Sequence, residues 1–137
     1  MRKRTQSREF ALQLLYQIDI SGDKDCDAAL NNLWERQEKD TAADVKDFAA
    51  ELFRGVVANL KEIDSRIAQY ASNWQIGRMA VVDRNILRLA SYELIFRDDI
   101  PPKVSINEAI ELAKKYSGPE AAKFVNGILD KVKSEKK

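Results

Sequence analysis

Four basic side chains stand close together at the N-terminus of this chain, with no acidic residue among them. They are Arg2, Lys3, Arg4 and Arg8. The whole sequence has a net charge of +1, so the residues that follow this basic arm carry a net charge of −3. Such a concentration of positive charge suits a polyanion better than a small substrate. The alternative is a solvated terminus without a binding role.

An aromatic residue follows the arm at a position where it could stack on a nucleobase. Thr5 or Ser7 can cap a helix that ends at Ser21-Gly22. The apolar face of this helix comprises Phe10, Ala11, Leu14, Leu15 and Ile18. Tyr16 falls almost opposite that face, on the same side as Arg8. A ring in that place can stack on an unpaired base, which contributes ~1–3 kcal/mol. Packing against a neighbouring helix or a partner protein is the alternative interpretation.

The residues that usually perform catalysis are scarce. The chain has no histidine, which is the commonest general base near neutral pH and the commonest metal ligand. Neither a G-x-x-x-x-G-K-[ST] loop nor a G-x-G-x-x-G fingerprint occurs. Cys26 stands between two aspartates that disfavour a thiolate, and a single cysteine permits no intramolecular disulfide. We therefore expect no enzyme, no metal site and no cofactor.

Hydropathy and length point to one cytoplasmic domain. No apolar run approaches the ~20 residues needed to span a membrane, and the basic N-terminus lacks the long apolar region of a secretory signal. With 137 residues, the chain is long enough to bury a single core. We expect residues 1–137 to form one helical domain with a basic N-terminal arm.

Apolar residues recur at helical spacing throughout, so we predict an all-α fold of about six or seven helices, arranged as two helical subdomains. Asp25 or Asp27 should cap a short helix. The run over residues 44–70 is long enough to bend or break, with Gly55 allowing a close helix crossing. The helix over residues 80–96 is apolar around much of its circumference, which is typical of a central helix. Interruptions are expected at Ser72-Asn73-Trp74 and Ile76-Gly77.

The last third of the chain predicts two helices separated by Gly118-Pro119. The first helix should begin at Ile106, with Ser105 as its N-cap and Glu108 as the capping-box partner. Helical spacing places the following residues on its apolar face: Ile106, Ala109, Ile110, Ala113 and Tyr116. Proline suits the first position of the second helix. Gly127 lies inside that helix at a cost of ~1 kcal/mol relative to alanine, which indicates close packing or the close approach of a ligand.

The same region resembles the NusB family of transcription antitermination factors. The runs INEAIELAKKY and KFVNGILDKV carry the resemblance. Four more stretches match in order and spacing: REFALQLLY from Arg8, FRGV from Phe53, Ile63-Asp64, and ILRLASYEL from Ile86. The resemblance covers essentially the whole chain. It implies an all-helical protein that binds boxA RNA as a heterodimer with the ribosomal protein NusE and joins an antitermination complex on RNA polymerase.

The resemblance also implies which residues contact RNA. Carried over by motif, they are Arg2, Lys3, Arg4, Arg8, Tyr16, Glu120, Lys123 and Phe124. The arm matches the family pattern loosely because its basic residues are spread out. Glu120 stands where relatives often carry Asp. Phe124 belongs by periodicity to the apolar stripe of its helix, so an RNA contact requires it to lie at the edge of that stripe.

Two other interpretations remain open. One is the NusB-like domain at the N-terminus of certain ribosomal RNA cytosine methyltransferases, although a chain ending at Lys137 leaves no room for a cofactor-binding domain. The other is a helical interaction module or homodimer that does not bind RNA. For NusE, the expected surface involves the helix over residues 80–96 and the helices from Ser105 onward. The free protein could also form a homodimer.

Overall fold

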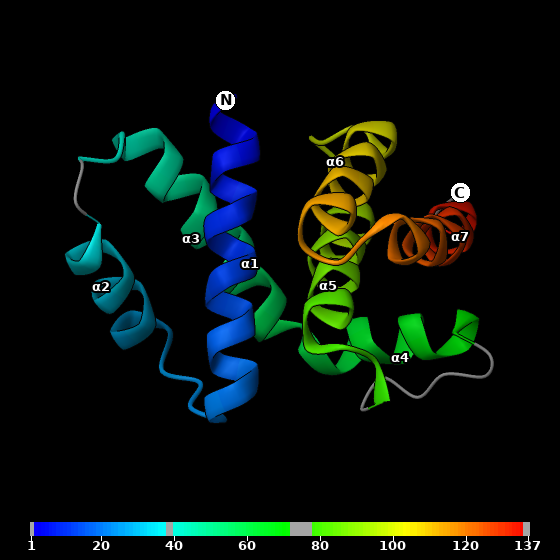
Figure 1. The fold of residues 1–137 in the computed structure, drawn as a ribbon, viewed down its shortest axis with the longest axis horizontal. Helices are drawn as coiled ribbons and strands as arrows, with labels where there is room; N and C mark the ends of the chain where they lie inside the picture. The colour runs from blue at the N-terminus through cyan, green and yellow to red at the C-terminus, as the bar shows by residue number, and fades with distance from the viewer. Residues whose placement is uncertain (1, 38–39, 72–77, 136–137) are drawn as a thin grey trace.

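The computed structural model describes residues 2–37, 40–71 and 78–135, and the regular structure in these ranges is helical (Figure 1). Its seven α-helices are α1 (Lys3–Ser21), α2 (Cys26–Arg36), α3 (Ala43–Ala58), α4 (Leu60–Tyr70), α5 (Val81–Phe96), α6 (Pro102–Tyr116) and α7 (Pro119–Glu135). The predicted all-α fold is confirmed. The interruptions predicted at Ser72-Asn73-Trp74 and Ile76-Gly77 lie outside the described residues.

The helices form two groups around one core. Figure 1 shows α1, α2 and α3 on one side of the molecule and α4 to α7 on the other. One hydrophobic cluster contains buried residues from both groups, among them Leu14, Phe53, Leu89 and Leu129. The two predicted helical groups therefore share a continuous interior.

Helix α5 occupies the centre, as its sequence predicted. Its residues Asn85 to Leu94 are buried, apart from the partly exposed Arg88. Arg88 pairs with Asp64 of α4 at 2.8 Å and with Asp19 of α1 at 3.0 Å. Since both groups of helices pack on α5, this helix fixes their relative positions.

The long apolar run breaks at Asn59, between α3 and α4. The carbonyl oxygen of Gly55 accepts twice from Asn59, from the backbone amide at 3.2 Å and from the side-chain amide at 2.8 Å, which closes the end of α3. Gly55 lies directly against the Tyr92 ring, so a Cβ at this position would collide with Tyr92. The expected close crossing is confirmed.

The predicted start of the first helix is wrong. Helix α1 begins at Lys3, with Arg2 as N-cap and no side-chain capping bond. Thr5 and Ser7 lie inside the helix, where their hydroxyls donate to Glu108 of α6 at 2.6 Å and to the carbonyl oxygen of Val45 at 2.8 Å. The hydroxyls of Thr5 and Ser7, which the sequence predicted as caps, thus bind neighbouring helices instead. The Asp25 cap of α2 is confirmed, since its carboxylate accepts from the Ala28 amide at 3.1 Å.

The predicted capping box at Ser105 and Glu108 is also wrong. Helix α6 begins at Pro102, because a proline at the first position suits a helix start. The Ser105 hydroxyl instead donates to Glu93 of α5 at 2.8 Å. Glu108 turns inward and accepts from Thr5 and Arg8. Both side chains serve the packing of α6 on its neighbours.

The break at Gly118-Pro119 is confirmed. Helix α6 ends at Tyr116 and α7 starts at Pro119, with Gly118 at φ +134°, in a region that favours glycine. The close packing suggested for Gly127 is wrong, since no atom lies within 4 Å of a Cβ built there. Tyr116, expected on the apolar face of α6, is 48% exposed.

Candidate nucleic-acid interface

The basic arm forms the first turns of α1. Arg2, Lys3 and Arg4, which we call the arm triplet, are exposed. Arg2 has extended backbone angles and its carbonyl oxygen accepts from the Gln6 amide at 3.1 Å. The triplet is therefore held at the end of a helix.

Neighbouring helices orient each member of the arm triplet. The Arg2 guanidinium lies 3.5 Å from Glu108 of α6. Lys3 donates to Asp44 of α3 at 3.1 Å, and this hydrogen bond lowers the pKa of Asp44. The Arg4 guanidinium carbon lies 3.7 Å from the centre of the Phe48 ring. These contacts restrict the side chains without burying them, which reduces the entropy that a bound polyanion must offset.

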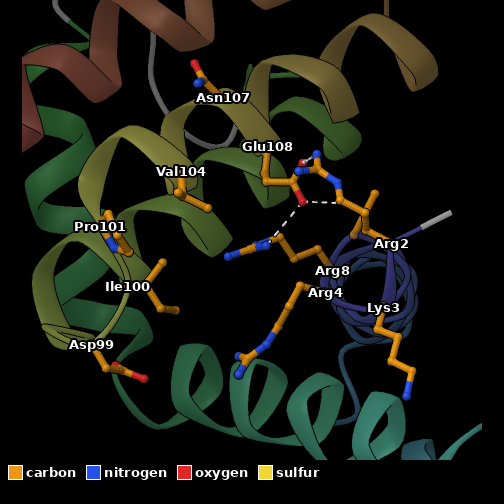
Figure 2. A pocket seen from close by; sticks show the side chains of 11 residues that line it. Arg2, Lys3, Arg4, Arg8, Asp99, Ile100, Pro101, Val104, Asn107 and Glu108 are labelled. Atoms are coloured by element: carbon orange, nitrogen blue, oxygen red, sulfur yellow. Dashed lines mark hydrogen bonds and ion pairs between the residues drawn. The ribbon is translucent and has the colours of Figure 1, made fainter.

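A groove of about 480 Å³ lies between the arm triplet and the start of α6. Figure 2 shows Arg4 and Arg8 of α1 facing Ile100 and Val104 across this space. Val104 is 42% exposed. The groove combines a cationic wall with an apolar wall, which suits a nucleotide better than a free inorganic anion.

Arg8 differs from the rest of the arm because it is buried, with an exposed fraction of 3%. It donates to Glu93 from Nη2 at 2.7 Å and from Nε at 2.9 Å, and to Glu108 from Nη1 at 3.2 Å. Burial tends to lower the pKa of Arg8, but the hydrogen bonds and charges of the two glutamates outweigh it and raise that pKa. The Arg8 guanidinium thus links α1 to α5 and α6 through its hydrogen bonds, and in this structure it is too buried to contact a phosphate.

Tyr16 lies farther along α1 and is 42% exposed. Twelve residues separate it from Arg4, which corresponds to ~18 Å along a helix. The sequence placed Tyr16 on the same side as Arg8, but one is exposed and the other buried. Eight residues advance a helix by about 80° beyond two full turns, enough to carry Tyr16 away from the buried sector.

The three predicted residues of α7 lie at its first turns. Glu120 and Lys123 are exposed, and Phe124 is partly buried. Phe124 packs against the hydrophobic cluster and also lines a hollow of about 270 Å³ that includes Glu120 and Asp83. Phe124 therefore lies at the edge of the apolar stripe, as a contact with RNA would require.

The predicted residues fall into two patches. The arm triplet occupies one end of α1. Tyr16 shares a groove with Val82 at the start of α5, and the next residue, Asp83, lines the hollow that contains Glu120 and Phe124. Consecutive residues of α5, Val82 and Asp83, thus line the two hollows that contain Tyr16 and the α7 residues.

Sequence reasoning missed Asp83, Lys115 and Tyr116 as parts of this surface. Asp83 retains one carboxylate oxygen that is buried without a hydrogen-bond partner. Tyr116 and Lys115 lie beside Tyr16 in the same groove. Their positions could not be inferred because α6 and α1 are distant in sequence and the apolar period of α6 assigned Tyr116 to the interior.

Neither a spanning helix nor a metal cluster is found in residues 2–37, 40–71 and 78–135. None of the helices there is both long and apolar enough to cross a membrane. The same ranges contain no group of three or more His, Cys, Asp or Glu side chains placed to hold a metal ion.

Comparison with known proteins gives a consistent set of relatives. The NusB family matches residues 5–134. The chain is 45% identical over 136 residues to the transcription antitermination protein NusB of Chloroherpeton thalassium, covering 98% of this chain and 63% of that protein. It is 50% identical over 133 residues to the NusB of Anaeromyxobacter sp. strain Fw109-5, covering 95% of this chain and 89% of that protein.

Solved structures of related proteins share the fold. The NusB structure from T. maritima has a TM-score of 0.85 at 41% identity, covering 96% of this chain and 91% of the other. A crystal structure of the antitermination factors NusB and NusE in complex with double-stranded RNA has a chain with a TM-score of 0.87 at 32% identity. That match covers 98% of both chains.

Proposed function

We propose a function for this protein on the premise that it belongs to the NusB family. It acts as a transcription antitermination factor and not as an enzyme. Residues 1–137 form one RNA-binding domain that works in the cytoplasm on nascent transcripts. The RNA is the boxA element in single-stranded form, and the transcripts served include ribosomal RNA.

NusE is the proposed protein partner, and the pair joins an antitermination complex on RNA polymerase. The support is the similar structure in which NusB, NusE and RNA occur together. Helix α5 is covered within this protein over most of its length, so we place the NusE surface chiefly on α6 and α7. Dimerisation of the free protein is a separate expectation, which light scattering in the absence of NusE tests.

The arm triplet is the observation that carries the RNA assignment. Three exposed cations at the start of α1 line one groove with apolar residues just before and within the first turn of α6, namely Ile100, Pro101 and Val104. Phosphates can compete for the side chains of Arg2 and Lys3, because the Lys3–Asp44 pair is exposed on both sides and Arg2 is itself exposed, with a long contact of 3.5 Å to the buried Glu108. Binding should therefore depend strongly on salt.

Tyr16, Glu120, Lys123 and Phe124 form the second part of the proposed interface. Tyr16 offers a half-exposed ring for base stacking, Lys123 a cation for a phosphate, and Glu120 a carboxylate that can accept from a base amino group. Arg8 supports the interface indirectly, because its buried contacts hold α1 against α5 and α6.

The deciding experiment is fluorescence anisotropy of a labelled boxA RNA titrated with this protein, with and without NusE, at two salt concentrations. A scrambled RNA of the same length is the control. Preference for boxA, with tighter binding when NusE is present, supports the proposal. Equal and weak binding of both RNAs under all conditions would favour an interaction module that does not read RNA.

A further inference from the structure

A second groove, of about 640 Å³, lies between α1 and the C-terminal end of α6, with Val82 of α5 at its border. We call it the α1/α6 groove. Tyr16 lines it from α1 and Tyr116 lines it from α6, and these rings are 42% and 48% exposed. Phe10 and Leu12 contribute apolar surface, and Gln13 carries an exposed amide. Two exposed aromatic rings in one hollow form a surface on which a flat ligand can stack.

The Tyr116 ring is held from two sides before any ligand arrives. Its hydroxyl donates to Glu9 of α1. Lys115 donates to the same Glu9 oxygen at 2.5 Å, and its ammonium nitrogen lies 5.2 Å from the centre of the Tyr116 ring. A ring fixed in this way loses little conformational entropy when a ligand stacks on it.

The charges of the groove favour a base over a phosphate. Glu9 and Lys115 neutralise each other, so the aromatic surface stands in a locally balanced environment. The amides of Gln13 and Gln17 can donate to and accept from the polar edge of a base. Stacking surface together with amide groups is the combination that recognises unpaired bases in single-stranded RNA.

The groove also continues the proposed RNA surface. Tyr16 belongs to both, and Val82 stands next to Asp83, which lines the hollow with Glu120 and Phe124. We propose that the α1/α6 groove binds one unpaired base of the RNA, which stacks on Tyr116 beside Tyr16 while Gln13 contacts its edge. This inference rests on the proposed function and adds Tyr116 and Gln13 to the interface.

The test combines two variants of the full chain with a scan of the RNA. Tyr116→Leu removes the ring and keeps apolar volume, whereas Tyr116→Phe keeps the ring and removes the hydroxyl. Each position of a labelled boxA RNA is replaced in turn by an abasic nucleotide, and affinity is measured by anisotropy in the presence of NusE. Phe96→Leu is the matched control, because Phe96 is an exposed aromatic residue at the far end of α5.

We expect one abasic position to weaken binding to the unmodified protein about tenfold. Tyr116→Leu should weaken binding of the intact RNA by a similar factor and abolish the effect of that abasic position. Tyr116→Phe should keep the abasic effect and lose only a small part of the affinity, because the ring remains while its hydrogen bond to Glu9 is lost. Phe96→Leu should bind like the unmodified protein. Thermal unfolding of each variant checks that the fold is retained.

Three results would overturn the inference in distinguishable ways. If Tyr116→Leu binds with every abasic penalty unchanged, the base lies elsewhere while the proposed function stands. If Tyr116→Leu loses affinity for NusE in the absence of RNA, the groove is a protein surface. If the unmodified protein does not distinguish boxA from scrambled RNA, the proposed function fails together with this inference.

Discussion

Arg8 and Glu93 form a buried, two-pronged ion pair that joins α1 to α5. Both oxygens of Glu93 accept from Arg8, at 2.7 and 2.9 Å, and the two side chains are 4% and 1% exposed. Glu108 adds a second carboxylate to the same guanidinium at 3.2 Å. The position of α1, which carries the arm triplet and Tyr16, therefore depends on a charge in the interior of the protein.

Arg8→Met should destabilise the protein strongly, because it leaves the buried Glu93 carboxylate without its cation and Glu108 with only the longer contact to Arg2. Breaking a buried pair in this way costs ~3–5 kcal/mol, which urea unfolding at neutral pH would measure. Lys3→Met is the matched control, since the Lys3–Asp44 pair is largely exposed and should contribute under ~1 kcal/mol. Equal small losses in both variants would contradict a structural role for Arg8.

Replacing Arg2, Lys3 and Arg4 together by alanine should weaken binding to boxA RNA. It should also reduce the slope of log K against log salt by ~2, because each cation that neutralises a phosphate of a single strand contributes ~0.7 to that slope. Thermal stability should change little, because the triplet is exposed. The comparison is a triple alanine variant at Lys24, Lys61 and Lys133, which are exposed elsewhere. An unaltered affinity and slope in the first variant would remove the arm from the interface.

Sequence reasoning succeeded where a structural signal is local. The Asp25 cap and the turn at Gly118-Pro119 follow from backbone chemistry within a few residues. Gly55 indicated where a neighbouring helix could approach closely, but not that Tyr92 is the side chain that does so. Sequence reasoning failed at Ser105 and Glu108, where a side chain suited to capping is used by another helix. Because a side-chain cap contributes only ~1 kcal/mol, the protein loses little stability when Ser105 and Glu108 form buried hydrogen bonds with other helices instead.

The candidate interface shows the same limit. The exposure of the arm triplet agrees with its charge, but the burial of Arg8 could not be foreseen because its partners lie 85 and 100 residues away in the sequence. Periodicity assigned Tyr116 to the interior, and only the packing of α6 beside α1 shows it in a groove with Tyr16. Pairing across distant helices is the information that one sequence lacks.

The carboxyl of Asp99 should titrate unusually low. Two hydrogen bonds from Arg97, each of 2.9 Å, are the largest cause that lowers the pKa of Asp99 from 3.8 to about 2. Because the folded pKa lies below the ordinary value, the stabilisation from this pair is complete above the ordinary pKa and is lost as the pH falls toward the lowered one. Carbon NMR of the side-chain carboxyls measures the titration. Arg97→Met should return the pKa toward its ordinary value, and a normal midpoint in the unmodified protein would contradict the assignment.

Gly55→Ala should destabilise the protein although alanine is the better helix former. The added methyl group would collide with the Tyr92 ring, and overpacking of this kind costs ~1–3 kcal/mol. Gly127→Ala is the matched control, since nothing lies within 4 Å of its added Cβ, and it should gain up to ~1 kcal/mol. Urea unfolding of both variants measures the difference. If Gly55→Ala also stabilised the protein, the close contact between α3 and α5 would not exist in solution. A Gly127→Ala variant that folds well but binds RNA or NusE poorly would show that a partner approaches α7 at this glycine.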